Sequence, residues 1–235
     1  MKKLVDVYES FYNALIPESR YLSYLEGLKM TLLISLFAVI LGVLIGIIVA
    51  AIRVFSKETK NLFVRIVSKI CVFYITVFRG TPLMVQLMII YYLVFTSRDT
   101  NPILVGAVCF GLNSGAYVSE IVRAGIESID KGQTEAGRSL GFTAIQTMRY
   151  IILPQAVKNI LPALGNEFIV LVKETSVISV IAINDLMKMA GFVGSRTYDP
   201  LTAYIIAAFI YLVIVLALSK LLGLFERRLA KSDNH

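Results

Sequence analysis

The sequence is poor in the residues that most often carry catalysis or bind metals. It has one histidine, His235, two cysteines, Cys71 and Cys109, and no tryptophan. It has no His-Glu-x-x-His pattern and no Cys/His cluster, so we expect neither a metal site nor a catalytic set. Both cysteines fall in apolar runs, and we expect them to be small buried residues rather than a disulfide.

Charge is also scarce. Charged residues make up 17% of the 235 residues and hydrophobic residues 57%, with a net charge of +7. A soluble domain has about 25% charged and about 45–50% apolar residues. These values exclude a disordered chain and argue against a soluble enzyme. The positive charge in so apolar a chain fits a membrane protein with Lys and Arg on one side, and we expect no nucleic-acid partner.

Five segments are long and apolar enough to cross a membrane, which takes about 20 residues. They cover residues 24–52, 63–95, 103–124, 160–183 and 201–224. We therefore predict an all-α membrane protein with five transmembrane helices. The second segment would extend roughly 50 Å as a straight helix, so it must tilt, protrude or break. Gly42 and Gly46 in the first segment form a Gly-x-x-x-Gly pattern, which is typical of close helix packing.

Lys and Arg are distributed unevenly between the two sides of such a bundle. One side would carry thirteen: Arg53, Lys57, Lys60, Arg65, Lys69, Arg123, Lys131, Arg138, Arg149, Lys158, Arg227, Arg228 and Lys231. The other would carry six: Lys2, Lys3, Arg20, Arg98, Lys188 and Arg196. Because cytoplasmic loops are enriched in these residues, we expect the N-terminus outside and the C-terminus in the cytoplasm.

The ends of the chain are expected to flank a membrane domain at residues 24–229. Residues 1–23 hold apolar side chains at helical spacing up to Pro17: Leu4, Tyr8, Phe11, Tyr12 and Leu15. This pattern predicts a short helix in the outer membrane interface, with a frayed tail as the alternative. Residues 230–235 are expected to form a cytoplasmic tail.

The loop between the third and fourth segments, residues 130–156, contains several helix-capping signals. We expect Thr134 to cap a short helix in which Glu135 lies at the positive end of the helix dipole. Gly141 suits the left-handed residue that closes a helix. Thr143 can cap a second short helix, limited by Pro154. The sequence thus predicts two rigid helices in the cytoplasm, suited to receive force from a soluble partner.

Several of these motifs together resemble a known family. Glu135-Ala136-Gly137, Gly141 and Leu153-Pro154-Gln155-Ala156 resemble the EAA loop of importer permeases of the ATP-binding-cassette class. Gly132-Gln133 and Arg79-Gly80-Thr81-Pro82 resemble the polar amino acid permeases in that class, the histidine/glutamine permease-like family, and Lys173-Glu174-Thr175-Ser176 resembles a further family stretch. The resemblance covers about residues 28–229. Gly137 departs from the usual Ala and Val177 from the common Leu.

The resemblance implies a permease subunit of an ATP-driven importer in a bacterial cell membrane, carrying polar amino acids by alternating access. It implies a coupling helix that contacts an ATPase dimer through Gln133, Glu135, Ala136 and Gly141. It also implies a second membrane subunit, identical or homologous, and an extracytoplasmic amino acid-binding protein. The chain has no Gly-x-x-x-x-Gly-Lys-Ser/Thr loop, so we expect no cofactor and no enzyme activity here, with ATP and Mg on the ATPase. The alternatives are an ion-coupled secondary transporter and a membrane-embedded enzyme.

Polar residues inside the expected spans are candidates for contacting the cargo, because charge is costly in the membrane. Gly80 and Pro82 should break the second span, with Thr81 as N-cap and Pro82 first in a new helix. Arg79 and Gln86 beside this break could hold an amino acid carboxylate, as broken helices do in transporters. The alternative is that Arg79 pairs with a structural acid such as Glu120.

The expected fourth span contains an acidic residue that could complement the positive charge of Arg79. Glu167, with Asn166 beside it, is placed to receive an ammonium group, whereas Lys173 and Glu174 suit a structural pair or helix-end anchors. In the third span, Asn113, Ser114, Tyr117 and Glu120 include positions of one helix face. Tyr117 could line the pathway, or it could be a packed tyrosine with a bonded hydroxyl. The predicted cargo residues are Arg79, Gln86, Tyr117, Asn166 and Glu167.

Overall fold

The computed structural model describes residues 2–57, 59–95 and 100–231, and within them all regular structure is helical. The α-helices are α1 (Lys2–Leu15), α2 (Tyr21–Ser56), α3 (Leu62–Gly80), α4 (Leu83–Val94), α5 (Pro102–Glu127), α6 (Lys131–Ser139), α7 (Ala144–Thr147), α8 (Leu153–Glu174), α9 (Leu186–Thr197) and α10 (Pro200–Lys231). The predicted all-α class is confirmed. Arg98 and His235 lie outside the described residues, as does most of the predicted tail.

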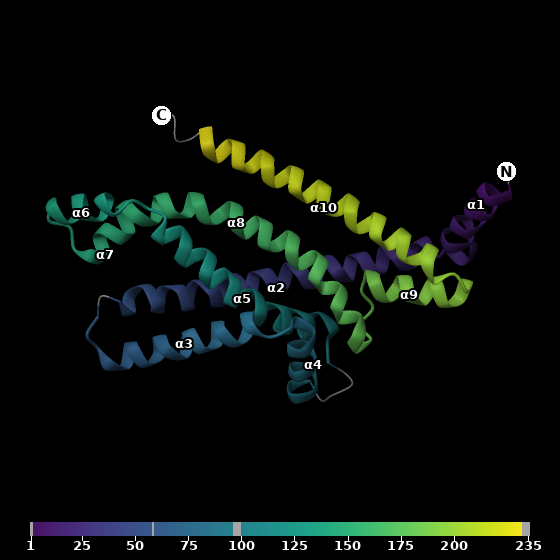
Figure 1. Ribbon diagram of the computed structural model, residues 1–235, viewed down its shortest axis with the longest axis horizontal. Coiled ribbons are helices and arrows are strands. Elements are labelled where there is room, and N and C mark those ends of the chain that lie inside the picture. Colours follow the sequence, from purple (N-terminus) through teal and green to yellow (C-terminus); the bar gives the residue numbers. More distant parts are fainter. Residues whose placement is uncertain (1, 58, 96–99, 232–235) are drawn as a thin grey trace.

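The long helices run roughly along one axis of the molecule (Figure 1). The connection between α2 and α3, the α6–α7 region and the end of α10 lie toward one end, whereas α1 and α9 lie toward the other. The three segments that we expect in the cytoplasm therefore share an end. This arrangement agrees with the charge distribution.

Three helical stretches within the described residues are long and apolar enough to cross a membrane, namely Pro17–Ser56, Pro102–Glu127 and Pro200–Arg228. A fourth is obtained if Ala144–Ile181 and Leu186–Thr197, which meet at a bend of 53°, form one span. The predicted second span is instead divided into α3, which carries three basic residues, and the 12-residue α4. The five-span count therefore stays a prediction.

Helices α2 and α5 form the most extensive contact in the fold. A Cβ atom added at Gly42 would lie 2.8 Å from the Ser114 Oγ atom, and one at Gly46 would lie 2.6 Å from the Val118 Cβ atom. The two glycines therefore let α2 approach the backbone of α5, which confirms the packing expected from the Gly-x-x-x-Gly pattern. Cys71 and Cys109 are buried and unpaired, as expected.

The N-terminal segment folds against the far end of the bundle. Helix α1 ends at Leu15, before Pro17, so the helical prediction is confirmed. Ala14 is buried in a cluster with residues of α9 and α10, and Phe11 and Leu15 pack against that cluster. Tyr8 and Tyr12 are exposed, whereas the Leu4 side chain lies outside the described residues. The location of α1 in a membrane interface stays a prediction.

Candidate functional site

The expected break in the second span is present between α3 and α4. Helix α3 ends at Gly80, Thr81 and Pro82 are extended, and α4 begins at Leu83. The predicted capping is wrong by one residue, because Pro82 is the N-cap of α4 and Thr81 is the C-cap of α3. Thr81 is extended because steric contact with the following Pro82 excludes helical backbone at that position. Its hydroxyl donates a hydrogen bond back to the Val77 carbonyl of α3 at 2.8 Å.

Gln86, one turn into α4, holds this break together. Its Nε2 atom donates to the Phe78 carbonyl at 2.8 Å and to the carbonyl and hydroxyl of Thr81 at 2.9 and 2.8 Å. Its Oε1 atom accepts a hydrogen bond from Asn113 Nδ2 on α5 at 2.7 Å. Gln86 is buried, and both ends of its amide are engaged by the chain itself. In this conformation, Gln86 fixes the break rather than presenting a free amide.

Arg79 lies in the last turn of α3, directly before the break. Its guanidinium group lies 5.4 Å from the centre of the Tyr117 ring, a cation–π contact, and 3.6 Å from Glu120 Oε2. Both partners are on α5, three residues apart, so they share a face. The Arg79 side chain is 43% exposed. The structure thus brings Arg79 and Tyr117 together, and it also contains the Arg79–Glu120 pair considered as the alternative.

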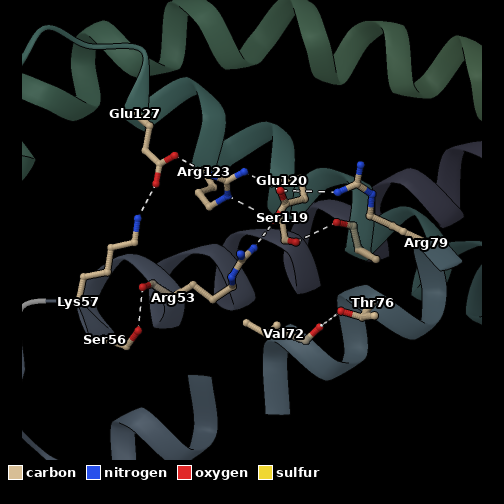
Figure 2. Close-up of polar contacts among 11 residues, drawn as sticks. Arg53, Ser56, Lys57, Val72, Thr76, Arg79, Ser119, Glu120, Arg123 and Glu127 are labelled. Carbon is tan, nitrogen blue, oxygen red and sulfur yellow. Dashed lines mark hydrogen bonds and ion pairs between the residues drawn. The ribbon is translucent and has the colours of Figure 1, made fainter. Parts of the chain in front are cut away.

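Glu120 has two closer partners than Arg79 (Figure 2). Arg53 of α2 donates to Glu120 Oε1, and Arg123 donates to Glu120 Oε2 at 2.7 Å. From the sequence, Arg53 and Arg123 were expected among the loop charges, and their contact with Glu120 was not predicted. The spacing of Glu120, Arg123 and Glu127 along one helix face was the available signal. Arg53 and Arg123 already neutralise Glu120. Of the three arginines, Arg79 lies farthest from the Glu120 carboxylate, so its guanidinium group is the most available to bind another anion.

Glu167 lies on α8 and contacts α5 from another side. Its Oε1 atom accepts a hydrogen bond from the Ser114 hydroxyl at 2.8 Å. Ser114 is adjacent to Asn113, which donates to Gln86. Two neighbouring residues of α5 therefore contact Gln86 at the break and Glu167 of α8. Asn166 is exposed. The predicted cargo residues Arg79, Gln86, Tyr117 and Glu167 therefore gather around one stretch of α5, whereas Asn166 is not among the described residues that contact it.

Two of the predicted helix caps in the 130–156 loop, the C-cap at Gly141 and the N-cap at Thr143, are present. Gly141 has φ +84°, and Phe142 and Gly141 donate their amides to the Gly137 and Arg138 carbonyls, a Schellman C-cap. Thr143 and Gln146 form a reciprocal capping box at the start of α7. The expected N-cap at Thr134 is wrong, because Asp130 caps α6 by accepting from the Gly132 amide at 2.7 Å.

The two-helix prediction for this loop needs a further correction. Helix α7 does not stop at Pro154 but passes through a π-helical turn, Met148–Ile152, into α8, where Pro154 lies in the first turn. Proline lacks the amide that would continue regular α-helical bonding, and Pro154 lies two residues after the π-helical turn, where that bonding is already interrupted. Only α6 is therefore separate from the long helices. Glu135 and Ala136 are exposed along it.

The α6–α7 region presents apolar side chains to its surroundings. Leu140 is 76% exposed and Ile145 is 68% exposed. Gln133 accepts a weak hydrogen bond from Gln155 of α8 at 3.4 Å, which places it beside the base of the loop. A capped helix with exposed apolar residues next to it has the character of a docking surface for another protein.

These features define a multi-span transport protein rather than a soluble one. They are the membrane-length helices of the bundle, the broken helix that bears an arginine, and the capped helical protrusion. The chain matches the family "Binding-protein-dependent transport system inner membrane component" over residues 39–231, and it belongs to that family. It is therefore an integral membrane protein.

Relatives that match along most of the chain support the assignment. The chain is 41% identical to the arginine transport system permease protein ArtQ of Bacillus subtilis over 224 residues, which cover 94% of this chain and 98% of that one. It is 36% identical to the glutamine transport system permease protein GlnP of Escherichia coli, covering 87% and 92%. A crystal structure of an amino acid ABC transporter with histidines matches with a TM-score of 0.80 and 46% identity, covering 88% and 94% of the two chains.

Proposed function

We propose that this chain is the permease subunit of an ATP-driven importer of polar amino acids in a bacterial inner membrane, working by alternating access. Relatives named for arginine and glutamine transport support the cargo class. The observation that carries the proposal is the position of Arg79, exposed at a broken helix and only loosely paired with Glu120. No feature of the described residues favours an ion-coupled secondary transporter.

In this proposal, the amino acid carboxylate binds Arg79 and the ammonium group binds Glu167. A guanidinium group can hold a carboxylate through two parallel hydrogen bonds. The first amides of α4, next to Arg79, add the positive end of a helix dipole. Tyr117 supports the guanidinium group from one side, Gln86 fixes the geometry of the break, and Asn166 lies beside Glu167. These roles are mutually compatible because α5 contacts both the Arg79 side and the Glu167 side of the proposed site.

The proposed assembly follows from the family. Five spans enclose a pathway only when paired, so we propose a second membrane subunit, identical or homologous. An ATPase dimer carrying ATP and Mg would dock at α6 through Gln133, Glu135, Ala136 and Gly141, on the cytoplasmic side. The exposed Leu140 and Ile145 beside α6 support that surface. An extracytoplasmic amino acid-binding protein would deliver the cargo, with the N-terminus outside and the C-terminus in the cytoplasm.

The test is uptake into proteoliposomes that contain this chain and its ATPase, with the binding protein outside and radiolabelled L-glutamine or L-arginine as the probe. We expect uptake that needs ATP inside and is indifferent to sodium and proton gradients. Deleting residues 133–141 should abolish uptake. Accumulation driven by an ion gradient in the absence of ATP would contradict the proposal, and so would full activity without residues 133–141.

A further inference from the structure

Charges of alternating sign connect the break in the second span to the base of the α6–α7 region (Figure 2). Glu120 contacts Arg79, as described above, and Arg123. Arg123 reaches onward to Glu127 Oε2, and Glu127 Oε1 accepts from Lys57 Nζ at 2.6 Å. The order is therefore Arg79, Glu120, Arg123, Glu127 and Lys57, with three members on α5.

Arg123 is the member that can change partners. Its guanidinium group is shared between Glu120, through Nε at 3.3 Å and Nη2 at 2.7 Å, and Glu127, through Nη1. Arg79 approaches the same Glu120 Oε2 atom that Arg123 binds, at 3.6 Å. Two cations thus share one carboxylate oxygen. If Arg79 leaves, this oxygen is bound by Arg123 alone, which strengthens the hold of Glu120 on Arg123 at the expense of Glu127.

The Lys57 end of this series of charges lies at a cavity beside α6. Lys57 and Glu127 line a cavity of about 1000 Å³ together with Lys131 and Arg138 of α6. Lys131 and Arg138 form no ion pair within the part of the chain that the structure describes. A Glu127 carboxylate that loses Arg123 therefore has two unpaired cations of α6 across the same cavity.

We propose that this series is a relay that reports cargo binding to the coupling helix. A cargo carboxylate takes Arg79 from Glu120, Arg123 then shifts from Glu127 to Glu120, and Glu127 turns to Lys131 or Arg138. The result is a pull of α6 toward the end of α5. The relay rests on the proposed function, because it needs a carboxylate at Arg79 and an ATPase on α6. Glu120, Arg123 and Glu127 are positioning residues in it and do not touch the cargo.

The test measures cargo binding and ATP hydrolysis separately in the complete complex in lipid nanodiscs, with L-glutamine and L-arginine as probes. The variants are Glu127→Gln, Glu120→Gln and the double variant, with Lys57→Gln as a second change at the far end. Glu226→Gln is the matched control, because Glu226 is exposed on α10 and lies outside the relay. Basal ATP hydrolysis and the yield of complex report on folding and assembly.

In Glu127→Gln we expect unchanged cargo affinity and basal hydrolysis, with stimulation by cargo reduced roughly 2- to 30-fold, the range for residues that carry coupling between sites. Effects of Glu120→Gln and Glu127→Gln should be strongly non-additive. Normal stimulation in Glu127→Gln and Lys57→Gln would overturn the relay, as would additive effects or a parallel loss of affinity. A wild-type complex that fails ATP-driven uptake would instead overturn the proposed function itself.

Discussion

Asn113 of α5 donates a hydrogen bond from Nδ2 to Gln86 Oε1 of α4 at 2.7 Å, in a buried position beside the broken helix. Gln86 is also bonded to Phe78 and Thr81, on the other side of the break. The pair therefore ties the start of α4, the end of α3 and the middle of α5 together. This relationship fixes where Arg79 lies relative to α5.

Asn113→Leu should destabilise the protein by about 1–3 kcal/mol, because it leaves a buried amide oxygen of Gln86 without its donor. The measurement is thermal unfolding of the purified protein in detergent. Asn166→Leu is the matched control for stability, because Asn166 is exposed, and it should shift stability by less than about 0.5 kcal/mol. Equal midpoints for the two variants would show that the Asn113–Gln86 bond does not hold the break.

Gly46→Ala should destabilise the α2–α5 contact by about 1–3 kcal/mol, the usual result of overpacking a tight interface. The added Cβ atom would lie 2.6 Å from Val118 Cβ and 2.9 Å from the Ser119 amide nitrogen. Gly223→Ala in α10 is the control, because a Cβ atom there meets nothing within 4 Å. That variant should be stabilised by roughly 0.5–1 kcal/mol, since alanine favours helix more than glycine does. The same unfolding assay distinguishes them.

Asp130→Ala should loosen the start of α6 by about 1 kcal/mol, the usual cost of losing an N-cap. Thr134→Ala should have little effect on the cap, because Asp130 and not Thr134 accepts the first free amide. Hydrogen exchange of the α6 amides measures both. Faster exchange in Thr134→Ala than in Asp130→Ala would restore the assignment made from the sequence.

Arg79→Lys should impair uptake while leaving assembly and stability intact. Lysine keeps the positive charge but lacks the planar pair of donors that binds a carboxylate at two points. We expect the apparent KM for L-glutamine or L-arginine to rise about tenfold, which corresponds to about 1.4 kcal/mol of lost binding. Arg65→Lys on the exposed side of α3 is the control. A KM unchanged in Arg79→Lys would remove Arg79 from the cargo site.

The local features of the chain could be predicted because each depends on a few neighbouring residues. Pro82 lacks a backbone donor and, two residues after Gly80, interrupts the helix, Gly141 readily adopts positive φ, and the Thr143 cap needs only amides within the next three residues. The errors arose where two local choices compete. Thr134 and Asp130 are both good N-caps, and only the path of the chain between α5 and α6 selects Asp130.

The sequence by itself determined the helical membrane class, the break after Arg79 and the capped loop, since apolar periodicity and backbone sterics act over short distances. Only the tertiary structure decided how the charges are paired. Arg53 and Glu120 are 67 residues apart, yet they meet because α2 packs closely along α5. Together with the Arg123–Glu120 pair, which the spacing along α5 could have indicated, that contact neutralises Glu120 and leaves Arg79 loosely held. The Arg53–Glu120 contact itself could not be read from any spacing along the chain.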